Sequence, residues 1–283
     1  MVGGDKNMKT RNIGKKQTAI VLSIFAFAVL VSSLMVGTAS AHMLYIDAND
    51  KPDAPSVQAA KIIFGHPNNP AGHIVPQLKE VKQYRPDGTV VDLRAIEKDN
   101  HSVAYFLYPG GVNIIVASRE PSVYAGKLSK GDFGEILCCG GDAGNAVDPA
   151  TGMIPWAKVT GQELEIVPLV NPFNLHVGDT FKAAILSNGS SINGSYAGAH
   201  GTKSIHNATQ AQIGETAENG IFSIDITEPG MWQVKAEYII EKPGTWIATS
   251  DNIRGNETKW LTGDAVEYER ERYRATLTFF ALP

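Results

Sequence analysis

Short apolar segments, separated by Gly, Pro and Asp-Gly or Asn-Gly turns, constrain the fold of this chain more than any other feature. Apolar runs of about four to eight residues between such turns predict β-strands. Pro86-Asp87-Gly88 lies between two of them, at 81–84 and 89–93, and predicts a hairpin turn. Further strands are predicted at 59–64, 102–107, 112–118, 163–168, 180–186, 220–226, 231–240 and 274–282. The pattern predicts an all-β protein.

The strand pattern is interrupted once. Residues 124–156 carry many Gly and Pro without a clean period, and we interpret them as a long excursion with one short helix. A new series of strands begins near Gly161. We therefore predict two β-sandwich domains, residues 42–160 and 161–283, of which the second has the strand spacing of an immunoglobulin-like sandwich.

The first 41 residues predict an N-terminal signal segment. Basic residues precede the apolar run at 19–37, which ends in Thr38-Ala39-Ser40-Ala41. A basic flank, an apolar centre and a small-x-small ending are typical of a cleaved signal peptide, with the cut before His42. The alternative is an uncleaved membrane anchor, because the run approaches the roughly 20 residues that span a bilayer. Both readings place the remainder outside the cytoplasm, as a periplasmic, cell-surface or secreted protein.

Composition argues against several classes of function. The formal net charge is −4, and no basic stripe indicates a nucleic-acid partner. The two cysteines, Cys138 and Cys139, are adjacent, so they cannot form a disulfide framework; a reduced Gly-rich turn is favoured over a redox or metal role. The chain has no Gly-x-Ser-x-Gly, His-Glu-x-x-His or Walker motif, and we predict no enzymatic activity.

Histidines are the candidate metal ligands. After cleavage His42 would carry a free α-amine with a reference pKa near 8, so one residue could offer both an amine and an imidazole. Neutral imidazole suits nickel, cobalt, copper and zinc. His66 and His73 lie together in a Pro/Gly loop after a predicted strand, and His200 and His206 would share one face if 202–205 were a strand. Each of these histidines has the alternative interpretation of an exposed residue without a role.

Residues 163–179, which read ELEIVPLVNPFNLHVGD, resemble the second domain of an exported family tied to nickel and cobalt uptake. That family is known as the periplasmic component of a cobalt/nickel transport system. Similar stretches are 218–226 (ENGIFSIDI), 229–232 (PGMW), 274–279 (RATLTF), the mature start Ala41-His42 and the pair Gly65-His66. Departures are Met43-Leu44-Tyr45 after His42, where the family has an acidic residue and then aromatics, and the Cys138-Cys139 pair.

The resemblance implies an extracytoplasmic accessory protein that binds nickel or cobalt, with a membrane metal-uptake transporter as its partner and His66 among the ligands. Two alternatives stay open. The chain could be an exported structural protein that binds a glycan or another protein, or a copper-dependent redox enzyme built on an N-terminal histidine.

Overall fold

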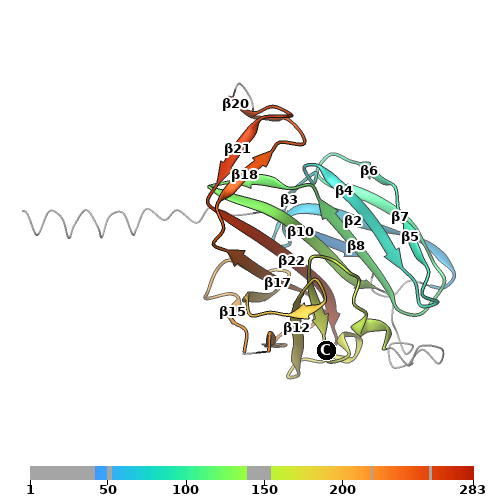
Figure 1. Ribbon diagram of the computed structural model, residues 1–283. Helices are drawn as coiled ribbons and strands as arrows, with labels where there is room; N and C mark the ends of the chain where they lie inside the picture. The colour runs from blue at the N-terminus through green and yellow to red at the C-terminus, as the bar shows by residue number, and fades with distance from the viewer. Residues whose placement is uncertain (1–41, 50–52, 139–153, 218, 255–256) are drawn as a thin grey trace, which may run out of the picture. The chain divides into compact units, whose positions relative to one another are not determined.

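The computed structural model describes residues 42–49, 53–138, 154–217, 219–254 and 257–283 (Figure 1). The predicted signal segment and Cys139 lie outside these residues. His42–Pro283 forms one compact unit, and none of the described helices is long and apolar enough to cross a membrane. The protein is all-β, as the spacing of apolar segments predicts.

Three sheets form the body of this unit. The first contains β1 (Met43–Ala48), β2 (Ser56–His66), β3 (Asn69–His73), β6 (Ala95–Glu97) and β7 (Ser102–Tyr108). The second contains β4 (Leu78–Tyr84), β5 (Val90–Asp92), β8 (Asn113–Arg119), β9 (Ser122–Tyr124), β10 (Lys127–Cys138), β14 (Ser195–His200), β15 (Gln212–Glu215), β17 (Gly230–Ile240) and β22 (Arg270–Ala281). The third contains β11 (Leu164–Pro168), β12 (Thr180–Ser187), β13 (Ser190–Ser191) and β16 (Ile221–Asp225).

The nine-stranded second sheet is the central layer, with a hydrophobic core on each face. On β8, Ile114 and Val116 belong to one core, whereas Ile115 and Ala117 belong to the other. Successive side chains of a strand point to opposite faces, so β8 is covered on both sides. The first sheet covers one face and the third sheet covers the other.

The strands after residue 161 form the predicted immunoglobulin-like sandwich. The order β11-β12-β16 in the third sheet faces β15-β14-β17-β22 of the central sheet. Phe181 of β12 stacks on Phe279 of β22 in the core between them, with ring centroids 4.5 Å apart. Two short 3₁₀ turns, Pro155–Ala157 and Pro172–Asn174, flank β11.

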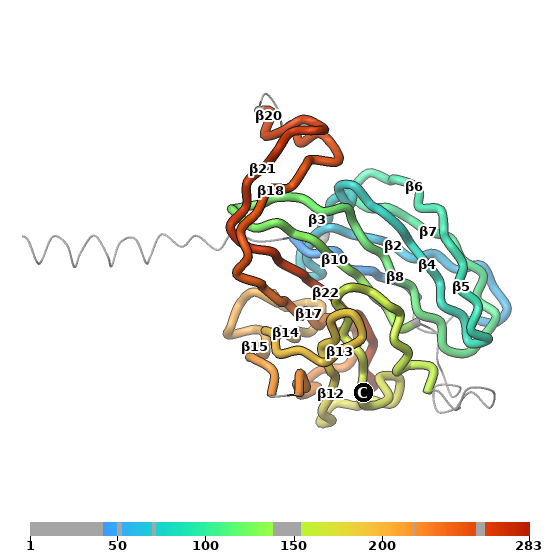
Figure 2. Tube along the Cα trace, viewed as in Figure 1, coloured from blue at the N-terminus to red at the C-terminus, as the bar shows by residue number. Residues whose placement is uncertain are grey.

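The central sheet contains strands from both sides of residue 160, the predicted domain boundary. β10 pairs in parallel with β22, so segments far apart in the sequence lie side by side (Figure 2). The predicted division into residues 42–160 and 161–283 falls between β10 and β11, and whether either half folds alone stays a prediction.

The prediction of an irregular excursion was wrong for Lys127–Cys138, which form the 12-residue strand β10. Its glycines and charges hid it from the apolar pattern, and each has a packing reason. A side chain at Gly131 would meet the Phe133 ring at 2.2 Å, and one at Gly134 would meet Leu44 at 3.1 Å. Asp132 is buried because three arginines surround it.

Two small antiparallel pairs lie outside the three layers. They are β18 (Gly244–Ile247) with β21 (Ala265–Tyr268), and β19 (Asn252–Arg254) with β20 (Glu257–Trp260). Figure 1 shows this arm, in orange-red, extending away from the sandwich.

Candidate functional site

Four of the five candidate histidines meet at one end of the first sheet. β1 runs antiparallel to β2 with Met43 opposite Gly65, which brings His42, just before β1, beside His66 at the end of β2. Phe64 is paired with His73, the last residue of β3. The fourth, His206, lies in the loop between β14 and β15, where the buried neighbour Ile205 packs with Met43, Ala197 and Ala199. We call His42, His66, His73 and His206 the histidine cluster.

The four rings form a row. The centroids of His73 and His42 are 4.8 Å apart and nearly parallel, at 26°. His42 and His66 are 5.5 Å apart at 73°, and His66 and His206 are 4.8 Å apart at 85°. The row begins at the exposed His73, passes through His42 to the buried His66, which is 8% exposed, and ends at the half-buried His206. A ligand can therefore reach the cluster from the His73 side.

His66 is neutral at neutral pH. Burial lowers the pKa of its imidazole to about 4, and the nearby His42, Arg274 and Lys235 contribute in the same direction. A neutral ring has a nitrogen lone pair to give, which is the form in which histidine ligates a metal.

The spacing of the rings fits shared coordination, although the rings are not yet oriented for it. With metal–nitrogen bonds of about 2.1 Å, two imidazoles on one metal have ring centres about 5 Å apart. Neighbouring rings in the cluster are 4.8 to 5.5 Å apart. Among the described residues, however, no three His, Cys, Asp or Glu side chains are placed to close a common metal shell. Ring rotations about the side-chain bonds would be needed to bind a metal.

A buried charge network holds the backbone beneath the cluster. Arg274 Nε and Nη2 donate to the two carboxylate oxygens of Asp132, at 2.6 and 3.0 Å, and Arg119 Nη1 donates to Asp132 at 3.1 Å. Burial alone would raise the pKa of Asp132, but the adjacent Arg274 and Arg119 hold it well below its usual range. Arg274 Nη1 also donates to the carbonyl oxygen of His42 at 3.2 Å. This network fixes where β1 begins.

An aromatic contact links the same network to the rings. Phe64 lies edge-on to His42 at 5.6 Å, and the guanidinium of Arg119 lies 4.9 Å from the centre of the Phe64 ring. The sequence pattern marked none of Phe64, Arg119, Asp132 and Arg274 as site residues. Arg274, at the first position of the predicted strand 274–282, was the one available signal, because a buried arginine needs a partner.

The fifth candidate, His200, lies apart from the cluster. Its Nδ1 is 2.8 Å from Thr202 Oγ1, and its Nε2 is 3.1 Å from the Pro229 carbonyl oxygen. Residues 202–205 do not form a strand, so the condition for a shared face is not met. The chain turns there, with Lys203 N bonded to His200 O, so His200 and His206 do not share a strand face.

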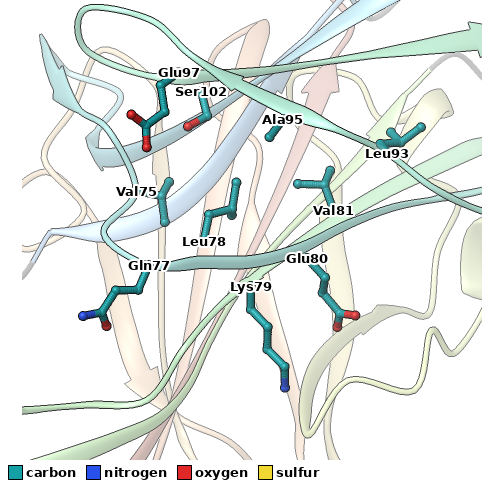
Figure 3. Close-up of a pocket in the computed structure, with 10 residues that line it drawn as sticks. All are labelled: Val75, Gln77, Leu78, Lys79, Glu80, Val81, Leu93, Ala95, Glu97 and Ser102. Atoms are coloured by element: carbon teal, nitrogen blue, oxygen red, sulfur yellow. The ribbon is translucent and has the colours of Figure 1, made fainter. Parts of the chain in front are cut away.

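Two other features lie away from the cluster. The carboxylate of Asp47, on β1, pairs with Lys61 at 3.8 Å. A pocket of about 360 Å³ opens beside the first residues of β4. Figure 3 shows Val75, Leu78 and Val81 pointing into it while Lys79 points away. No histidine lines it; its walls are mixed, with Gln77, Glu97 and Ser102 beside the apolar side chains.

Comparison with known proteins adds a family model and one fold likeness. A model described as a domain of unknown function (DUF4198) matches residues 144–240. No curated protein matches the chain. Among solved structures, "Biofilm associated protein - BSP domain" is 12% identical with a TM-score of 0.20. That match covers 84% of this chain and 30% of the other, so this chain spans less than a third of it.

Proposed function

We propose that the protein captures a divalent transition metal outside the cytoplasm, through the histidine cluster, and supplies it to a membrane metal-uptake transporter. The observation that carries the proposal is the convergence of four imidazoles from four separate segments, with neighbouring centroids 4.8 to 5.5 Å apart. Nickel and cobalt are the expected metals, and copper and zinc accept the same donors. The role is binding rather than catalysis.

The four histidines of the cluster have different roles in this proposal, set by their positions in the row. His42 and His66 form the centre of the row, and His66 supplies a neutral ring next to a fixed backbone. His206 extends the row beyond His66 and His73 extends it beyond His42, so either is a candidate to complete a set of three with them. If the chain is cut before His42, the new α-amine adds a further nitrogen beside the same ring.

The test is calorimetric titration of the mature chain, beginning at His42, with Ni(II), Co(II), Cu(II) and Zn(II) in a non-coordinating buffer. One site per chain is expected, weakened about 10- to 100-fold or more by His66→Ala, since loss of a ligand leaves a coordination position to water. The matched control is His200→Ala, which removes a histidine outside the cluster and should leave the affinity unchanged. Equal affinities for wild type and His66→Ala would exclude the cluster as the site.

One alternative uses the same residues. A copper ion held by His42, its amine and His66 could support redox chemistry with oxygen and a reductant. Copper-dependent oxygen consumption that is lost in His66→Ala would favour this enzyme. Binding of nickel or cobalt without such consumption would favour the transport role.

A further inference from the structure

The face of the central sheet beneath the histidine cluster carries more positive than negative charge. Arg119, Arg272 and Arg274 lie around Asp132. On the neighbouring strand β17, Glu237 lies directly opposite Arg274 of β22. Lys235, two residues before Glu237, lies on the same face. These described residues contribute four cationic side chains against two carboxylates.

Two of these four cations, Lys235 and Arg272, form no ion pair within 4.0 Å with the carboxylates of the network, and Arg272 does donate to Ser129 Oγ at 3.4 Å. Asp132 is occupied by Arg274 and Arg119. Among the described residues, Lys235 forms no ion pair within 4.0 Å and no side-chain hydrogen bond. Burial lowers the pKa of Lys235, while the charge of Glu237 acts in the opposite direction. A half-buried ammonium without a contacting partner is costly unless something else supplies the negative charge.

Buried polar groups without partners continue along the same face. The side-chain amide of Gln233 is 1% exposed, and within the described chain neither its nitrogen nor its oxygen has a hydrogen-bond partner. Thr278, paired with Gln233 across the two strands, is fully buried and its hydroxyl also lacks a partner there. Such groups call for a bound water, ion or ligand. Gln233 and Lys235 are about 7 Å apart along the strand, a span that one carboxylate can bridge.

We propose that Lys235 and Gln233 form a subsite for a carboxylate group, so that the protein takes its metal as a small anionic carboxylate chelate rather than as the bare ion. This inference rests on the proposed function and names the form in which the cluster receives its metal. The Lys235 ammonium and the Gln233 amide donate to the carboxylate oxygens. The histidine cluster supplies nitrogen to the metal's remaining positions.

Electrostatics explains why the carboxylate subsite and the histidine cluster would act together. A bare dication entering the cluster approaches Lys235 and Arg274, both close enough to act on His66 by charge. Like charges repel more strongly where water is partly excluded. A carboxylate that arrives with the metal offsets this repulsion and satisfies Lys235. The same excess of positive charge favours an anionic complex over a free cation at the encounter stage.

The experiment titrates the mature chain with Ni(II) alone, with the 1:1 Ni(II)–citrate complex, and with citrate alone. Wild type should bind the chelate about 10- to 100-fold more tightly than Lys235→Met does, the range expected for one charge-assisted hydrogen bond. Lys182→Met removes an exposed lysine on β12 and is the matched control, with wild-type affinity expected. Gln233→Leu is a second variant that should weaken chelate binding without changing charge. Thermal unfolding of each variant checks that it is folded.

The outcomes separate this inference from the metal-binding role. If Ni(II) alone binds, while citrate only strips it and Lys235→Met changes nothing, the carboxylate subsite is wrong and the metal site stands. If citrate binds in a Lys235-dependent way but no form of nickel does, the subsite stands and the metal role falls. If neither nickel, chelate nor citrate binds, both are wrong.

Discussion

Arg274 donates a hydrogen bond from Nη1 to the backbone carbonyl oxygen of His42, across 3.2 Å and between the last strand and the first. The same guanidinium uses Nε and Nη2 to hold both oxygens of Asp132. One buried side chain thus ties β1, β10 and β22 together directly beneath the histidine cluster. The position of His42 depends on this ion pair.

Asp132→Asn should therefore destabilise the fold strongly. The substitution removes the charge that compensates Arg274 and Arg119, and breaking one partner of a buried ion pair costs about 3–5 kcal/mol. The measurement is urea unfolding at neutral pH. Asp47→Asn is the control, because Asp47 pairs with Lys61 on the surface and its loss should cost less than about 1 kcal/mol. Comparable effects of the two substitutions would contradict the role assigned to Asp132.

Glu135 predicts a dependence of stability on pH. Burial raises the pKa of Glu135 well above its usual value, and the nearby Glu165 raises it further. The folded chain thus keeps a proton that the unfolded chain loses above about pH 4.5. Stability from this group is present below that pH and is lost as pH rises through the folded pKa. Glu135→Gln should flatten the decline in unfolding free energy that begins as pH rises above about 4.5, measured by urea titration at a series of pH values.

The control for this pH effect is Glu163→Gln. Glu163 is exposed, so its neutral replacement should leave the slope of unfolding free energy against pH as in wild type. In Glu135→Gln the hydrogen bond at this position can be kept. Gln162 Nε2, which donates to Glu135 Oε2 at 3.4 Å, can donate to an amide oxygen as well. Identical slopes for wild type and Glu135→Gln would show that another group governs the pH dependence.

The core of the second sandwich can be tested at Phe181. This ring is fully buried and stacks on Phe279 at 4.5 Å, joining the third sheet to the central one. Phe181→Ala should lower the unfolding free energy by about 3–5 kcal/mol, since it removes apolar contacts and leaves a cavity. Val57→Ala, at a side chain that is 70% exposed, should change it by less than about 0.5 kcal/mol. Denaturant unfolding of both variants checks the pair.

Strand positions could be predicted wherever the apolar pattern was regular. Residues 112–118 and 231–240 carry runs of apolar side chains, and they form most of β8 and β17. β10 could not be predicted. Its glycines leave room for Phe133 and Leu44, and its Asp132 is compensated by arginines from distant segments. Those reasons exist only in the assembled sheet, where β10 meets β22.

The histidine cluster shows the same limit. His42 and His66 could be chosen from chemistry and resemblance, but their closeness depends on the register that sets Met43 opposite Gly65. His206 joins them through the packing of Ile205, while His200, only six residues earlier, turns toward Pro229. Lys235 gave no sequence signal at all, because a single lysine in an alternating strand is ordinarily a solvent-facing residue.

The last prediction concerns the first residue of the mature chain. A chain that begins at His42 has an α-amine whose reference pKa is near 8, so protons should compete with the metal more as pH falls below that value. Adding one glycine before His42 turns this nitrogen into a peptide amide and moves the amine away. Nickel affinity, measured by competition with a chromogenic chelator, should fall about 10-fold or more. The same glycine added to the His66→Ala chain, which already lacks the neighbouring ligand, should have a smaller effect. An unchanged affinity in the wild-type background would mean that the amine is not a ligand and that the imidazoles act alone.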